Sequence, residues 1–234
     1  NDGYDDVIVG ARLYDIGQTD AGAAFVFHGG PEGVENGTPA NADAFLGGIF
    51  QNDYFGSVVG GAGDTNGDGY DDAVVTASFP NGTQSVHVYL GSFGGLASTA
   101  TTTLNSGQSL ASLDDVASAG DVNADGYADI VVGSYLFDGS RIDDGAAFVI
   151  HGGPSGIPSG SIATVADTSI FSGQAGSLFG IEVATASDVN NDGYDDILVG
   201  ADNYVDNIRR TVFVFLGGPA GIVATGPRDA AATL

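Results

Sequence analysis

One acidic motif recurs along the chain, and this recurrence constrains the fold more than any other feature. It reads DTNGDGYDD at 64–72, DVNADGYAD at 121–129 and DVNNDGYDD at 188–196, and the chain opens inside a fourth copy, NDGYDD at 1–6. The glycines that precede the tyrosine of each copy are 66, 57 and 67 residues apart. A near-constant period of this length predicts a fold assembled from equivalent units, each of them one supersecondary element.

Each unit offers four short runs of strand-like composition, bounded by Gly, Asn, Asp and Pro. In the second unit we place these runs near 55–62, 72–77, 85–90 and 98–104. Little helix is expected, because no segment carries apolar residues at helical spacing over a dozen positions. The sequence therefore predicts an all-β fold of β-propeller blades, each a sheet of four antiparallel strands. We expect one propeller segment over 1–234, with blades at about 1–50, 51–107, 108–172 and 173–234, the first of which lacks its inner strand.

Acids and amides alternate within the motif, as they do in loops that bind calcium. Positions 1, 3, 5 and 9 offer side-chain oxygens and position 7 a backbone carbonyl, which suits an ion that takes six to eight oxygen ligands. The glycine at position 6 permits a sharp turn. Magnesium is a weaker candidate, because it prefers to keep several of its waters. The predicted ligands of three complete calcium sites are Asp64, Asn66, Asp68, Tyr70 and Asp72; Asp121, Asn123, Asp125, Tyr127 and Asp129; and Asp188, Asn190, Asp192, Tyr194 and Asp196.

Three features limit this prediction. Position 12 is valine in every complete copy and strand-like sequence follows, so the loops are not EF-hands. The opening copy retains only Asp2, Tyr4 and Asp6, so we expect weak binding or none there, and we expect the chain to be a fragment of a longer one. Position 8 is aspartate in two loops and alanine in the third, which indicates that it is not a ligand.

The charge of the chain excludes some classes of partner. Five basic residues stand against thirty acidic ones, a net charge of −25, which argues against nucleic acid and anionic membranes. A hydrophobic fraction of 43% argues against disorder. Cysteine is absent, so no disulfide braces the fold. No apolar run approaches the roughly 18 residues that cross a bilayer.

Further motifs accompany the acidic loops. The pairs Phe55-Gly56 and Phe179-Gly180 precede two of them, and VGA follows at 9–11 and 199–201. Together these features resemble FG-GAP repeats, which form the β-propeller of integrin α subunits and occur in many secreted bacterial proteins. The resemblance implies Ca²⁺ at the residues named above, a secreted or cell-surface setting, and a larger propeller of the seven-bladed type. Ser112-Leu113 replaces the Phe-Gly pair in the third unit, which weakens any transfer of partner specificity.

Arginine and tyrosine concentrate in the connections that follow the second strand of each unit. In an up-and-down blade these connections lie at the end opposite the acidic loops. Since Arg and Tyr are enriched at binding hot spots, this end is a candidate ligand-binding face. In the alternative interpretation, the arginines pair with nearby acids and the aromatic rings cover the edge of the core. The candidates are Arg12, Tyr14, Tyr135, Arg141, Tyr204, Arg209 and Arg210.

The sequence favours a non-catalytic, calcium-binding adhesion module of an extracellular protein. Its partner would be a protein or a glycan, and remaining blades or a second copy would complete the ring. Two alternatives stay open: a calcium-dependent, polysaccharide-active enzyme of the lyase type, and purely structural spacer repeats. No separate cluster of His, Arg, Tyr and acids marks a catalytic centre. His28 and His151 share a repeat position with Leu90 and Leu216, which indicates an apolar environment.

Overall fold

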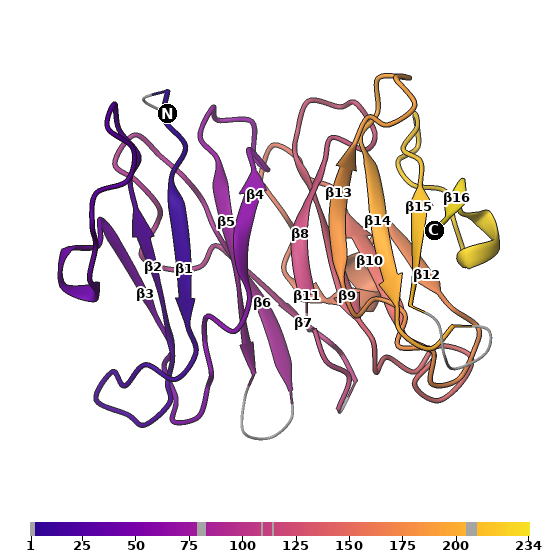
Figure 1. Ribbon diagram of the computed structural model, residues 1–234, viewed down its shortest axis with the longest axis horizontal. Coiled ribbons are helices and arrows are strands. Elements are labelled where there is room, and N and C mark those ends of the chain that lie inside the picture. The colour runs from indigo at the N-terminus through magenta and orange to yellow at the C-terminus, as the bar shows by residue number, and fades with distance from the viewer. Residues whose placement is uncertain (1–2, 79–82, 109, 114, 205–209) are drawn as a thin grey trace.

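Four sheets follow one another along the chain in the computed structural model (Figure 1). The structure describes residues 3–78, 83–108, 110–113, 115–204 and 210–234. Among these residues, helix is limited to α1 (Ile162–Val165) and two 3-10 turns, η1 (Pro39–Asn41) and η2 (Pro227–Asp229). The strands, sheet by sheet, are β1 (Val7–Ala11), β2 (Ala23–Phe27) and β3 (Ala44–Gly47); β4 (Val59–Gly63), β5 (Asp72–Ser78), β6 (Gln84–Tyr89) and β7 (Thr102–Asn105); β8 (Asp115–Gly120), β9 (Asp129–Ser134), β10 (Ala146–Ile150) and β12 (Thr168–Phe171); and β13 (Val183–Ser187), β14 (Asp196–Ala201), β15 (Thr211–Phe215) and β16 (Ala232–Thr233).

The expected all-β architecture of antiparallel blades is confirmed. Within each sheet, consecutive strands pair antiparallel in chain order, and the first sheet holds three strands rather than four. One strand departs from this pattern: β11 (Gly160–Ser161), from the third unit, pairs parallel with β7 and adds a fifth strand to the second sheet. The inner strands β4, β8 and β13 lie next to one another, so the sheets are arranged side by side like blades.

Each inner strand ends in a bulge where the acidic loop begins. The register shifts between Gly61 and Gly63 in β4, and at the equivalent places in β8 and β13. A bulge bends and twists the strand that carries it. The three acidic loops therefore leave their sheets in the same way, and they lie together at one end of the sheets, at the top of Figure 1.

Each sheet has two faces, which we call front and rear: the front face packs on the preceding sheet and the rear face on the following one. Between the second and third sheets, Val74 and Val88 of the rear face meet Ile130, Val132 and Phe148 of the front face. The other two junctions repeat this arrangement with equivalent positions. The hydrophobic core is thus divided into three layers, each shared by two sheets, and no sheet buries its apolar residues alone.

The Phe-Gly pairs fasten one sheet to the preceding one. Phe179 forms a parallel bridge with Gly145 of the third sheet, and Phe55 forms the equivalent bridge with the first sheet. Gly180 has φ +83°, and a Cβ on it would collide with the carbonyl oxygen of Ala146. The close approach of these two backbone segments therefore requires glycine at position 180. In the third unit, which lacks the pair, the N–H of Leu113 instead donates to a side chain of the second sheet, Gln84 Oε1, at 2.5 Å.

The first sheet shows the effect of having no described sheet packed on its front face. Its strand β1 is equivalent to β5, β9 and β14, whose residues are almost all buried, yet most of β1 is exposed. Val75, Val132 and Val199 are fully buried, whereas Val9, at the same repeat position, is 45% exposed. The difference is tertiary rather than local, because the residue type and the strand are the same.

Candidate metal sites

The three complete acidic loops adopt one conformation held by hydrogen bonds within each loop. The carboxylate at position 1 accepts from the N–H groups at positions 5 and 6: Asp64 Oδ1 accepts from Asp68 at 3.0 Å, and Asp64 Oδ2 from Gly69 at 2.8 Å. The same bonds recur at Asp121 and Asp188 with lengths of 2.8–3.0 Å. These contacts join residues four and five apart, so the local sequence is enough to specify them.

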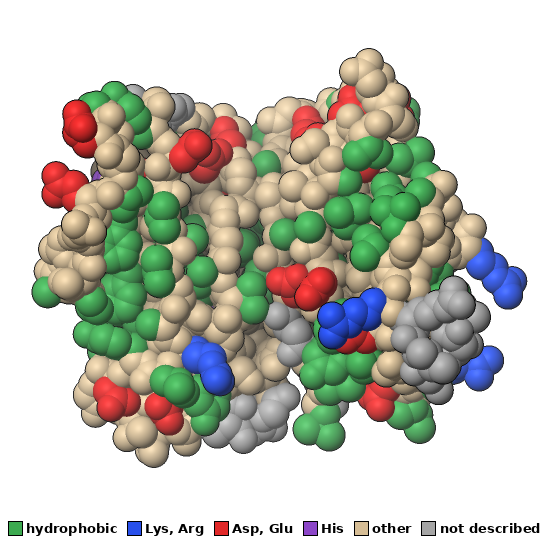
Figure 2. Space-filling model, in the orientation of Figure 1, with side chains coloured by type: hydrophobic (Ala, Val, Ile, Leu, Met, Phe, Trp, Pro, Cys, Tyr) green, Lys and Arg blue, Asp and Glu red, His purple; other side chains and the backbone are tan. Residues whose placement is uncertain are grey.

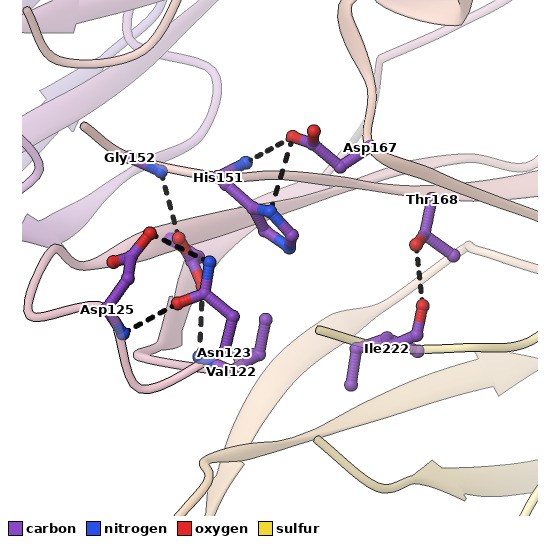
Figure 3. A network of polar contacts seen from close by, with 9 residues as sticks. Val122, Asn123, Asp125, His151, Gly152, Asp167, Thr168 and Ile222 are labelled. Carbon is purple, nitrogen blue, oxygen red and sulfur yellow. Dashed lines mark hydrogen bonds and ion pairs between the residues drawn. The ribbon is translucent and has the colours of Figure 1, made fainter. Parts of the chain in front are cut away.

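The amide and acid at positions 3 and 5 also bond to each other. In the second of these loops, the N–H of Asp125 donates to Asn123 Oδ1 at 2.9 Å, and Asn123 Nδ2 donates to Asp125 Oδ2 at 2.9 Å (Figure 3). Asp125 Oδ1 in turn accepts from the N–H of Tyr127 at 3.0 Å. The fifth residue is exposed in all three loops. The oxygens of positions 1, 3 and 5 are therefore gathered over the same short backbone turn.

The ninth residue ties each loop to the rest of its sheet. Asp129 Oδ2 accepts from the N–H of Val122 in its own loop, and Asp129 Oδ1 from Gly152, 23 residues away in the turn that follows β10, both at 2.9 Å (Figure 3). Asp72 and Asp196 make the equivalent pairs of bonds, and all three side chains are buried. These carboxylates hold the loop and the turn together whether or not an ion is bound.

Burial shifts the titration of two of these ninth residues. Desolvation raises the pKa of Asp129 to about 6, although its two N–H bonds act in the opposite direction, and desolvation also raises the pKa of Asp72. A raised pKa means that the protein environment disfavours the negative charge. A nearby cation would relieve that cost, so the environment of these two carboxylates suits a positively charged ligand.

The donor set fits a hard cation, but the side chains as placed are engaged with one another. Each loop provides only oxygen ligands: three carboxylates, one amide and the carbonyl of position 7. Among the described residues, no group of three acidic or histidine side chains has the spacing of a closed metal site. Each carboxylate oxygen still has a lone pair beyond its N–H bond. An ion could therefore bind these oxygens without breaking their N–H bonds. It would compete only with the side-chain bond from Asn Nδ2 at position 3 to Asp Oδ2 at position 5.

Position 8, which the sequence indicates is not a ligand, links neighbouring loops. Asp195 Oδ2 accepts from the N–H of Asp121 at 2.9 Å, and the N–H of Asp195 donates to the carbonyl of Asp121 at 3.1 Å. At the preceding junction Ala128 N–H donates to the carbonyl of Asp64 at 2.9 Å, without a side-chain bond. Sequence reasoning missed this role of Asp195, since its partner lies 74 residues away.

The opening copy of the motif keeps part of this arrangement. Asp6 Oδ1 accepts from the N–H of Gly29 at 2.9 Å, which is the turn-holding bond of the ninth position. Tyr4 is 45% exposed. Asp2 lies outside the described residues.

The candidate ligand-binding residues at the opposite end do not form one cluster. Tyr14 packs edge-on against Phe25 and Tyr204 against Phe213, with ring centroids 5.2 and 5.1 Å apart, so both rings cover the edge of the core. The equivalent ring in the third unit is Phe137, which follows the strand by the same number of residues, and not Tyr135. The signal that identifies Phe137 is its distance from the end of β9, which was available in the sequence.

The arginines of this end are distributed over several connections. Arg210 forms an exposed ion pair with Asp202 at 3.3 Å, as the alternative interpretation predicts. Arg12 lines a pocket of about 180 Å³ with Tyr54, Ser57 and neighbouring residues, and none of the other candidates that the structure describes lines it. Arg141 is exposed, Tyr135 is half-buried and Arg209 lies outside the described residues.

One contact of the described residues resembles part of a nucleophilic triad. Ser85 Oγ lies 2.8 Å from His87 Nε2, and His87 Nδ1 lies 3.3 Å from Thr103 Oγ1, a hydroxyl rather than a carboxylate. Ser85 is 2% exposed, and the His87 ring packs against Phe55 between two sheets. Burial also lowers the pKa of His87. A substrate could not reach this serine without separating the sheets.

Within the described part of the chain, no helix has the length and apolar character to span a membrane.

Comparison with known proteins identifies the repeats. The FG-GAP repeat family matches residues 179–223, and the FG-GAP-like repeat family matches residues 64–132. Both matches include a complete acidic loop, and the first begins at Phe179. The two matches together cover all three complete acidic loops and one of the two Phe-Gly pairs, Phe179-Gly180.

Curated relatives match over part of the chain. Integrin alpha pat-2 of Caenorhabditis briggsae is 38% identical over 86 residues, which are 37% of this chain and 7% of that protein. Integrin alpha-7 of Rattus norvegicus is 35% identical over 104 residues, 44% of this chain and 8% of that protein. The matched region thus spans less than a tenth of either relative.

Among solved structures, AofleA from Arthrobotrys oligospora aligns with 93% of this chain and 53% of its own, at 11% identity and a TM-score of 0.49. The family matches, the integrin α relatives and the recurring loops agree, and the chain contains FG-GAP repeats.

Proposed function

We propose that the chain is a calcium-stabilised, non-catalytic binding module of an extracellular adhesion protein. The observation that carries the proposal is the single hydrogen-bonded conformation shared by three separate acidic loops. Turn formation alone does not require acids at positions 1, 5 and 9 and asparagine at position 3 in every copy. The integrin α relatives support the adhesion role, and the buried Ser85–His87 contact gives no support to an enzyme.

In each loop the side chains at positions 1, 3, 5 and 9 and the carbonyl at position 7 would hold the ion. Three Ca²⁺ would add six positive charges to a chain of net charge −25. They would also fix one end of each of the last three sheets in a protein that has no cysteine. The opposite end, with Arg12 and its pocket, is left to contact a protein or glycan partner, and the blades of further FG-GAP repeats would complete a propeller.

Calorimetry and thermal unfolding test the calcium sites. We expect heat of Ca²⁺ uptake at three sites, a weaker response to Mg²⁺, and a melting temperature that rises with Ca²⁺ and falls with EDTA. The control is a triple variant with Asp68→Ala, Asp125→Ala and Asp192→Ala. These side chains are exposed, so in EDTA the variant should lose only the hydrogen bonds that they accept within their own loops, and its melting temperature should not respond to Ca²⁺. Absence of heat in the parent, with no effect of EDTA on melting, would refute the proposal.

The binding face has its own test. Protein and glycan arrays probed in saturating Ca²⁺ should yield a partner whose affinity falls when Arg12 is replaced by alanine. Arg228 at the other end of the chain is the matched control, because it lies in η2, away from the pocket. A partner that binds the Arg12→Ala variant and the parent equally would place the binding face elsewhere, and blank arrays would favour spacer repeats.

A further inference from the structure

Position 4 of the three complete acidic loops carries three different residues. It directly follows the asparagine at position 3, and it is Gly67 in the first complete loop, Ala124 in the second and Asn191 in the third. All three have positive φ, at +73°, +56° and +60°. Because the backbone conformation is shared, it does not by itself explain why only the first loop has glycine at this position.

A contact with the neighbouring loop explains the glycine. A Cβ on Gly67 would lie 2.7 Å from Cε1 of Tyr127, whose ring belongs to the acidic loop of the third sheet. Ala124 and Asn191 carry a Cβ at the same loop position, so their loops accommodate a side chain there. Packing between the second and third sheets therefore favours glycine at position 67, directly after the predicted ion ligand Asn66.

An asparagine that precedes glycine is chemically labile. The backbone nitrogen of the following residue can attack the amide carbon Cγ, and glycine has no side chain to hinder the attack. Asn66 is half-buried and Gly67 is exposed, and among the described residues the N–H of Gly67 donates no hydrogen bond. Asn66 Oδ1 accepts from the N–H of Asp68 at 3.0 Å, which holds the amide over the backbone of Gly67. Acidic side chains lie at the surface of this end of the sheets, where water reaches the loops (Figure 2).

We propose that Asn66 is a deamidation site, and that its conversion to isoaspartate disables the first complete loop while the other two persist. The Gly67 nitrogen forms a bond to Asn66 Cγ and gives up its proton, and Nδ2 takes a proton and leaves as ammonia. The resulting five-membered succinimide then adds one water molecule. Opening at Cγ gives aspartate, and opening at the backbone carbonyl gives isoaspartate. The overall change is the hydrolysis of one amide to an acid and ammonia.

The two products differ in their effect on the loop. Aspartate keeps the length of the backbone and an oxygen at position 3. It replaces the 2.9 Å bond from Asn66 Nδ2 to Asp68 Oδ2 by the repulsion of two carboxylates, which a cation would relieve. Isoaspartate instead leads the main chain through Cβ and Cγ, which adds a backbone atom between positions 3 and 4. Asp64 then loses its alignment with the N–H groups of Asp68 and Gly69, which it now accepts at 3.0 and 2.8 Å.

Ageing the purified chain in EDTA at mildly alkaline pH, followed by peptide mass spectrometry, tests the site. Fragmentation that distinguishes isoaspartate from aspartate assigns each product to its position. We expect Asn66 to convert while Asn123 and Asn190, in the same turn but without a following glycine, remain amides. Asn36, which precedes Gly37 in an exposed segment, is the reference for reactivity in the same sample.

Two variants move the reactivity between loops. Ala124→Gly should make Asn123 convert as Asn66 does, and glycine suits the positive φ at that position. Gly67→Ala should protect Asn66, and its melting temperature in EDTA checks the fold, because the added Cβ meets the Tyr127 ring. Ala124→Gly decides the question even if Gly67→Ala does not fold.

Calorimetry of the aged chain measures the effect on ion uptake, which rests on the proposed calcium sites. We expect uptake at one of the three sites to fall in proportion to isoaspartate at position 66, and full uptake by Asn66→Asp, which reproduces the other product. Asn66 that stays an amide while Asn36 converts, equal conversion in all three loops, an unreactive Ala124→Gly, or full uptake despite isoaspartate would each overturn the inference. Conversion of Asn66 in a chain that takes up no Ca²⁺ even when fresh would support the modification site and refute the calcium sites, so the two failures are distinguishable.

Discussion

Replacing one valine at a time at a single repeat position would measure how much of the stability lies between the sheets. Val75, Val132 and Val199 are fully buried on front faces that another sheet covers, and Val9 is 45% exposed on a front face that no described sheet covers. All four valines lie three residues after the ninth-position aspartate of an acidic loop. Substitution by alanine is therefore the same chemical change in the same local structure, and only the tertiary environment differs.

The magnitude follows from the carbon atoms removed. Val→Ala deletes two methyl-sized groups, worth about 1.6 kcal/mol at about 0.8 kcal/mol each when they are fully buried. A cavity of about 40 Å³ adds about 1 kcal/mol at about 24 cal/mol per Å³. We therefore expect Val132→Ala to lower the free energy of unfolding by about 2.5 kcal/mol. Val9→Ala should cost less than about 1 kcal/mol, since nearly half of the side chain is already in water and no closed cavity forms.

Urea unfolding provides the measurement. A loss of about 2.5 kcal/mol corresponds to a fall in melting temperature of roughly 5–10 °C for a chain of this size. Equal losses for Val9→Ala and Val132→Ala would show that the first front face is covered in solution. A loss below about 1 kcal/mol for all three buried valines would refute the inter-sheet core.

Three further predictions concern the junctions and the loops. Gly180→Ala should destabilise the fold by more than about 2 kcal/mol in thermal unfolding, because the added Cβ meets a backbone carbonyl at a positive φ. Gly173→Ala, also at positive φ but with open space around it, should cost only about 1–2 kcal/mol, and equal costs would contradict the close approach of the sheets. Asp195→Ala should lower the free energy of unfolding by about 1 kcal/mol and weaken Ca²⁺ uptake at the neighbouring loop, because it removes the bond to Asp121. Asp71→Ala, at the same loop position but exposed, should change neither quantity, and equal effects of the two variants would contradict a role for the inter-loop bond. Burial raises the pKa of the Asp115 carboxyl above 3.8, so the parent chain must bury a negative charge as pH rises from 4 to 7. The Asp115→Asn variant carries no such charge and should gain stability relative to the parent over this range in urea unfolding, and a pH-independent difference would contradict this.

The sequence alone determined the unit and its acidic loop. The period of the D-G-Y motif predicted four sheets, and strand-like runs in the second unit predicted β4 to β7 within a few residues. The conformation of each loop also follows from local sequence, because Asp64 bonds to residues four and five positions ahead. Short-range hydrogen bonds of this kind need no partner from the rest of the fold.

Only the tertiary structure decided which equivalent residues share a role. Asp195 reaches the neighbouring loop across 74 residues, and Asp129 reaches a turn across 23, and neither partner can be identified from the motif. Val9 and Val132 have the same place in the repeat, but one is half in water and the other buried. Burial depends on the sheet that lies alongside, and a repeat specifies its own residues but not its neighbours.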